Sequence, residues 1–80
     1  MRIYTIDGKC NLSGVRVKEA RLRLGISQEE LAVRLQLLDL QIGQMAISRI
    51  ETGKRLVPDF ELLILAEALG ITTDQLLGKE

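Results

Sequence analysis

The chain of 80 residues is 46% hydrophobic but contains one Phe and one Tyr, so we expect one small domain with an aliphatic core. A single cysteine cannot close an internal disulfide, and without histidine no zinc-finger ligand set can be assembled. The formal net charge is zero. No apolar run approaches the roughly 20 residues of a membrane span, and no signal-peptide pattern opens the chain, so we expect a cytoplasmic protein. Because histidine is absent and there is one cysteine, we expect no bound metal.

The first eleven residues, MRIYTIDGKCN, alternate polar and apolar side chains and contain Asp7-Gly8, a turn signal. They form either a flexible arm or a strand, and a strand needs a second strand to hold it, for example from another subunit. We favour an arm that is at least partly mobile. The predicted organisation is an N-terminal arm over residues 1–11 and one domain over residues 12–80.

Two helices with clear boundaries are predicted after this segment. The first covers residues 12–24 and stops at Gly25, a residue that suits the position after a helix C-cap. The second begins at Ser27, where SQEE is a capping box, and reaches about residue 38. The residues expected to face the core are Val17 and Leu24 in the first helix and Leu31, Leu35 and Leu38 in the second.

Three further helices are predicted. One covers residues 44–52 and is closed by Gly53, the next follows Pro58-Asp59 and stops at Gly70, and the last begins at Thr72 with a T-x-x-Q capping box. The residues expected to face inward are Ile47, Ile50, Leu62, Leu63, Ala66, Leu69, Leu76 and Leu77. The predicted fold class is therefore all-α, a compact five-helix bundle.

The charges are distributed unevenly along the chain. Residues 16–55 hold eight Lys or Arg against five Asp or Glu, whereas residues 56–80 hold one Lys against five Asp or Glu. The zero net charge argues against indiscriminate nucleic-acid binding, but one side of the molecule can be basic although the whole chain is neutral. An ordinary solvated surface explains the charges equally well.

Two charged residues fall on the apolar stripes of their helices. Arg21 lies on the inward stripe of the first helix, and Glu51 on that of the third. A charged group that faces a core needs a partner, because desolvation costs several kcal/mol per ion. We predict that the two residues form an ion pair that ties the first helix to the third. The alternative is that each side chain reaches solvent separately.

Three separated blocks of the chain carry a resemblance to a known family. The segments RVKEARLRLGISQEELA, AISRIETGKR and LLILAEALGITTDQLL resemble the Cro- and phage-repressor-like (XRE-type) helix-turn-helix family. The resemblance covers about residues 12–77, and the blocks match in order with the right caps and glycines. It implies that the second and third helices form the helix-turn-helix, that the third lies in the DNA major groove, and that a buried Arg–Glu pair occupies positions 21 and 51.

The resemblance also implies which side chains of the third helix face DNA bases. Glutamine can pair with adenine through two hydrogen bonds, arginine with guanine in the same way, and methionine can contact a thymine methyl group. A methionine at this position is equally well explained as a packing residue. The expected base contacts are Gln44, Met45, Ser48 and Arg49.

Contacts to the DNA backbone are implied at both ends of the helix pair. Gln28 matches a residue that binds a phosphate at the start of the second helix, where a helix N-terminus suits an anion; the alternative is a solvated first-turn residue. Thr52, Lys54 and Arg55 match the segment after the third helix, although a surface basic cluster is often only solvated. Gln41, in the turn between the helices, is expected near the sugar–phosphate edge.

The turn between the second and third helices departs from the family pattern by being longer. Twelve residues separate Leu35 from Ser48. We expect the second helix to continue to Leu38, Asp39 to end it, the next three residues to be extended, and Gly43 to be the N-cap of the third helix. Leu38, Leu40 and Ile42 would enlarge the core beneath the turn; the alternative is an exposed patch used for dimerisation.

The predicted function is sequence-specific binding of double-stranded DNA by a transcriptional repressor, a homodimer on a two-fold operator with half-sites about one helical turn apart. The alternative is a protein-interaction or antitoxin-like adaptor of the same fold with weak or no DNA binding, which the zero net charge and the apolar turn favour. An enzyme is not expected, because the chain lacks histidine and no base accompanies its serines or Cys10. No cofactor, membrane or small-molecule site is recognisable.

Overall fold

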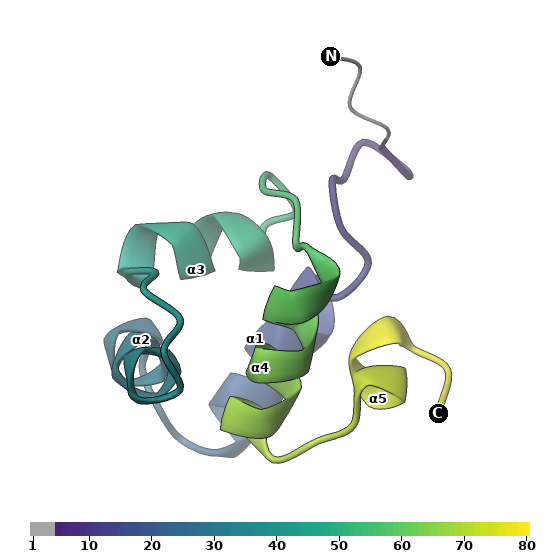
Figure 1. Ribbon diagram of the computed structural model, residues 1–80. Helices are drawn as coiled ribbons and strands as arrows, with labels where there is room; N and C mark the ends of the chain where they lie inside the picture. The colour runs from purple at the N-terminus through teal and green to yellow at the C-terminus, as the bar shows by residue number, and fades with distance from the viewer. Residues whose placement is uncertain (1–4) are drawn as a thin grey trace.

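Five α-helices follow one another in the computed structural model, which describes residues 5–80 (Figure 1). They are α1 (Gly14–Arg23), α2 (Gln28–Leu37), α3 (Gln44–Glu51), α4 (Asp59–Leu69) and α5 (Thr73–Leu77). Over residues 5–80 the only strand-like pairing is a single antiparallel bridge between Ile6 and Lys9. The prediction of an all-α, five-helix fold is confirmed.

The helix ends follow the capping signals of the sequence. The hydroxyl of Ser27 accepts a hydrogen bond from the Glu30 N–H at 3.0 Å, and the Ser27 N–H donates to the Glu30 carboxylate at 3.0 Å. Thr72 and Gln75 make the equivalent pair of bonds at 3.0 and 2.9 Å. The hydrogen bond from the Ser27 N–H to the carboxylate lowers the pKa of Glu30. These bonds satisfy N–H groups that the first turn of a helix otherwise leaves unpaired.

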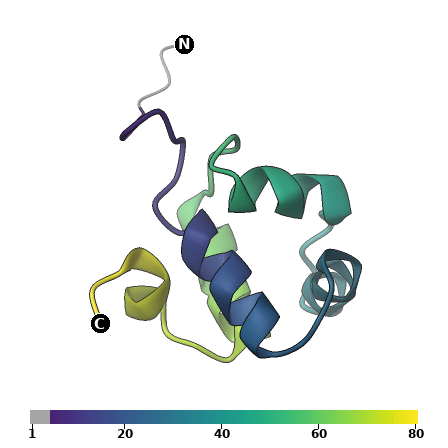
Figure 2. The same cartoon turned by 180° about the vertical axis from the view of Figure 1, so that it is seen from behind.

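The helices α1 and α4 form the centre of the molecule, with α2 and α3 on one side and α5 on the other (Figures 1 and 2). All five helices contribute apolar side chains to one core. The turn before α3 adds Leu40, which is buried. The buried aliphatic residues are Val17, Ala20, Leu31, Ala32, Leu35, Leu40, Ile47, Ile50, Leu65, Ala66, Ala68, Leu69 and Leu76.

Two residues that were expected to face the core lie at the surface. Leu24 is 45% exposed because it is the C-cap of α1, from which the chain turns away through Gly25. Leu63 is 64% exposed, and Leu65 is fully buried in its place. Apart from two glutamates and Asp59, every residue of α4 is apolar, so its sequence contains no clear stripe to define the buried face.

The start of α1 packs directly against the end of α3. A Cβ atom added to Gly14 would overlap the carbonyl oxygen of Ile50. Only glycine permits this approach of one backbone to the other. The position of α3 relative to α1 is therefore set by main-chain contact as well as by side-chain packing.

Candidate nucleic-acid interface

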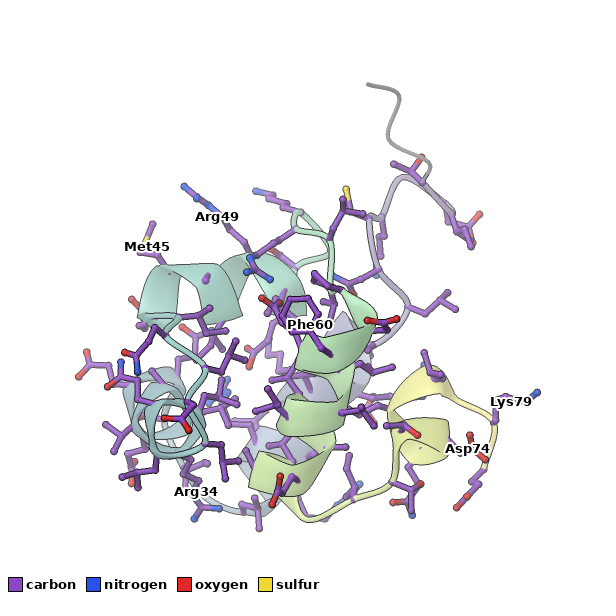
Figure 3. The ribbon with its side chains drawn as sticks, in the orientation of Figure 1. Arg34, Met45, Arg49, Phe60, Asp74 and Lys79 are labelled. Atoms are coloured by element: carbon purple, nitrogen blue, oxygen red, sulfur yellow. The ribbon has the colours of Figure 1, made fainter. Side chains whose placement is uncertain are left out.

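The side of α3 that faces away from the core presents mostly polar residues. Ile47 and Ile50 are fully buried, whereas Gln44, Met45 and Arg49 are exposed and Ser48 is half-buried. Figure 3 shows Met45 and Arg49 projecting from α3 away from the other helices. Met45 is 62% exposed, so it is not a packing residue within the domain.

The ion pair between Arg21 and Glu51 is present and joins α1 to α3. The Arg21 Nε donates to Glu51 Oε2 at 2.7 Å, and its Nη2 donates to Oε1 at 3.1 Å. The remaining guanidinium nitrogen donates to the Ile26 carbonyl at 2.9 Å. The hydrogen bond to Glu51 raises the pKa of Arg21 despite its burial. Two charged side chains thus lie inside the domain with their polar atoms paired.

A chain of hydrogen bonds leads from this buried pair to the exposed start of α3. The Gln28 Nε2 donates to Glu51 Oε1 at 3.0 Å, and the Gln44 Nε2 donates to Gln28 Oε1 at 2.6 Å. Gln28 lies at the first position of α2 and Gln44 at the first position of α3. The amide of Gln44 is therefore oriented by the protein, which reduces the side-chain entropy that a further contact would have to remove.

An open depression lies where the N-termini of α2 and α3 meet. It is lined by Arg21, Ser27, Gln28, Glu29 and Gln44. The first turn of α2 and the second N–H of each glutamine amide offer hydrogen-bond donors to an anion, whereas the guanidinium of Arg21 is already bound to Glu51 and Ile26. The carboxylate of Glu29 is the one lining group that disfavours an anion there. A phosphate contact at Gln28 stays a prediction.

The two ends of the lengthened turn between α2 and α3 match the sequence prediction, whereas residues 40–42, which were expected to be extended, contain a three-residue turn. Asp39 has a φ of +66° and closes α2, because its N–H donates to the Gln36 carbonyl at 3.0 Å and the Leu40 N–H donates to the Leu35 carbonyl at 2.9 Å. Gly43 is the N-cap of α3. This geometry is a Schellman motif with aspartate at the position usually taken by glycine.

The apolar residues of this turn pack rather than forming an exposed patch. Leu40 is buried, and Leu38 and Ile42 are half-buried against the core. The Ile42 N–H donates to the Leu40 carbonyl at 3.1 Å, so Gln41 is the central residue of a three-residue turn and is exposed. The structure therefore supports the packing role of the turn over the dimerisation role.

The segment after α3 contains the other residues that were expected to contact the DNA backbone, and they differ in the hydrogen bonds that they form within the protein. Thr52 donates its hydroxyl to the Ser48 carbonyl at 2.9 Å, and Lys54 is exposed. The guanidinium of Arg55 makes two bonds to the carboxylate of Glu61, at 2.6 and 3.1 Å. These bonds raise the pKa of Arg55.

The pairing of Arg55 with Glu61 was not predicted. Glu61 is 6% exposed although it lies in the first turn of α4, where acidic residues are ordinarily solvated. The only sequence signal for this ion pair is that Glu61 lies six positions after Arg55, inside an apolar helix. The contact assigns Arg55 a structural role, so Lys54 is the better candidate for a phosphate contact in this segment.

The comparison with known families agrees with this arrangement. A helix-turn-helix family model matches residues 17–76, which is 60 of the 80 residues. The chain belongs to the XRE-type helix-turn-helix family. The matched residues extend from α1 to α5, and the match supports a DNA-binding regulatory domain. None of the helices described in residues 5–80 is long and apolar enough to cross a membrane.

Proposed function

We propose that this helix-turn-helix domain binds double-stranded DNA in a sequence-specific way and acts as a transcriptional repressor. The observation that carries the proposal is the outward side of α3, where Gln44, Met45 and Arg49 are exposed beside the half-buried Ser48. Glutamine and arginine are the side chains that pair with adenine and guanine edges in the major groove. A helix of this diameter fits that groove.

Groups suited to phosphates flank this row of residues. The donor-lined depression at Gln28 lies at the N-terminal end of α3, and exposed Lys54 follows its C-terminal end. Backbone contacts on both sides fix the register of a helix in the groove, while base contacts select the sequence. Gln41 and Thr52 are further backbone contacts in the proposal, because both are exposed next to α3.

The proposal includes a homodimer on a two-fold operator, where it blocks a promoter. Phe60 and Leu63 lie one turn apart on α4, and 57% and 64% of these side chains are exposed. An apolar pair on one helix face favours contact with a second copy. A Phe60→Asp variant should then be a folded monomer by sedimentation, whereas Val33→Asp, at another exposed apolar residue, should remain dimeric.

The experiment that tests DNA recognition is selection of bound sites from random duplexes, followed by a salt titration with variants of α3. Arg49→Ala should lose about 1–3 kcal/mol of discrimination at one base pair. Arg49→Lys keeps the charge but loses the two-pronged geometry, so it should lose the base preference while retaining affinity for random duplexes. Lys54→Ala should weaken binding to all sequences alike.

Two results would contradict this proposal in different ways. Equal weakening of specific and random duplexes by Arg49→Ala and Lys54→Ala would show that α3 does not read bases. No duplex binding by the unaltered protein would favour the alternative, a protein-interaction or antitoxin-like adaptor. The exposed apolar face at Phe60 and Leu63 is the feature that such an adaptor would use.

A further inference from the structure

The residues that precede α1 are fixed to the segment that follows α3. The Cys10 N–H donates to the Gly53 carbonyl at 2.7 Å. The Asn11 amide nitrogen donates to the carbonyls of Ile50 and Arg55 at 3.1 and 2.8 Å, and its oxygen accepts a bond from the Gly14 N–H at 2.7 Å. The end of the expected N-terminal arm is thus attached to the domain, and residues 1–4 of that arm lie outside the described part of the chain.

Lys9 lies against the same segment. A Cβ atom added to Gly53 would be 2.8 Å from Lys9 Cγ and 3.0 Å from its Cβ, so the aliphatic stem of Lys9 covers Gly53. Gly53 immediately precedes Lys54 and follows Thr52, the C-cap of α3. The stem of Lys9 therefore lies beside the segment for which a phosphate contact is proposed.

The main chain around Lys9 is held as well. The N–H groups of Ile6 and Lys9 donate to each other's carbonyls at 2.9 and 3.0 Å. Asp7 and Gly8 between them have φ values of +53° and +77°, the signs required by a type I′ turn. This small hairpin and the Cys10 bond to Gly53 fix the backbone on both sides of Lys9. Holding Lys9 in this way lowers the entropy lost when its ammonium binds a charged group.

The charge of Lys9 has no structural use in the part of the chain described. Its side chain is exposed and forms no salt bridge with any residue from 5 to 80; the two ion pairs found there are Arg21–Glu51 and Arg55–Glu61. Nor does α3 need it as a C-terminal cap, because the N–H groups of Thr52, Gly53 and Lys54 already donate to the last carbonyls of that helix. The stem covers Gly53, and the ammonium remains available.

We propose that Lys9 is a DNA backbone contact that acts together with Lys54, so that the segment before α1 forms part of the DNA-binding surface. This inference rests on the proposed function. With Arg55 bound to Glu61, Lys9 replaces it as the second cation beside the C-terminal end of α3. Lys9 against Gly53 and Lys54 directly after it are two cations in one segment, which suits neighbouring phosphates of the DNA backbone.

The test uses methionine, which keeps the aliphatic stem over Gly53 and removes the charge. Lys9→Met should melt like the unaltered protein but bind duplex DNA about five- to tenfold more weakly at 0.1 M salt, with a log–log salt slope smaller by about one unit. Lys9→Arg should bind like the unaltered protein. Lys79→Met is the matched control, because Lys79 lies beside α5 on another side of the molecule (Figure 3), and it should leave both affinity and slope unchanged.

The outcomes separate this inference from the function on which it rests. If Lys54→Met weakens binding while Lys9→Met does not, Lys9 only covers Gly53 and the inference is wrong, although the domain still binds DNA. If Lys9→Met and Lys79→Met weaken binding equally, overall charge rather than a local contact is responsible, and the inference is again wrong. If the unaltered protein binds no duplex, the proposed function and the inference both fail.

Discussion

Arg21 of α1 and Glu51 of α3 face each other inside the domain, joined by two hydrogen bonds of 2.7 and 3.1 Å. The side chains are 9% and 2% exposed. Within residues 5–80, no buried side-chain nitrogen or oxygen lacks a hydrogen-bond partner. Each buried charge is therefore balanced by its partner. Removal of either residue would leave the other charge buried without a counter-ion.

Arg21→Met should lower the free energy of unfolding by about 3–5 kcal/mol, because Glu51 then stays buried without its cation. Adding Glu51→Leu should recover much of that loss, since neither charge remains. Urea denaturation of both single variants and the double variant measures the coupling. Small, additive effects of the two single substitutions would contradict an energetic role for the pair.

Asp39 occupies the position of the Schellman motif after α2 that glycine usually takes. Its φ of +66° is a conformation that glycine adopts without strain. Asp39→Gly should therefore raise the free energy of unfolding by up to about 1 kcal/mol, and Asp39→Val should lower it by roughly 1–2 kcal/mol. Thermal melts of the two variants check the difference; equal stability of both would be inconsistent with the left-handed backbone at this position.

Leu40→Ala should cost about 2–5 kcal/mol of stability, because Leu40 is buried beneath the turn. The loss should be the same at every protein concentration, since the side chain packs within its own domain. Melting curves recorded over a wide range of concentration provide the measurement. A loss that disappears at high concentration would instead assign Leu40 to an interface between copies.

Arg55→Ala should lower the free energy of unfolding by about 1–3 kcal/mol, because the carboxylate of Glu61 is nearly buried and loses two charged hydrogen bonds. Lys54→Ala, one residue away and exposed, should change stability by less than about 0.5 kcal/mol. The two variants are compared by urea denaturation. If Arg55→Ala is as neutral as Lys54→Ala, the ion pair makes no net contribution to the fold.

Local chemistry explains the parts of the fold that the sequence predicts well. The capping residues Ser27 and Thr72 and the glycines after α1 and α3 act within a few residues of themselves, so their effects can be read directly from the chain. The two ends of the long turn follow for the same reason, because Asp39 and Gly43 each act on adjacent backbone; the three-residue turn at Gln41 was not predicted. The pairing of Arg21 with Glu51 was predictable because each interrupts an otherwise apolar stripe.

The features that were missed depend on which segments meet in space. The helix α4 is apolar on nearly every side, so its sequence does not define the buried face, and the predicted stripe contains Leu63 instead of Leu65. The contacts of Asn11 span 39 and 44 residues of sequence, so no local pattern indicates them. The sequence does not distinguish Arg55 from other surface cations, because its partner Glu61 lies on α4, whose buried face the sequence does not define.

The contacts that hold α3 in the domain are on its inner side. Gly14, Asn11 and the buried ion pair all contact this helix on its inner side. The side chains of Met45 and Arg49 on the outer side are exposed and form no hydrogen bond or ion pair within residues 5–80. Substitutions at those two outer positions need no compensating change in the interior. Under the proposed function, the domain can therefore acquire a new target by exchanging a few surface residues, and its preference can be transplanted between related chains without redesigning the scaffold.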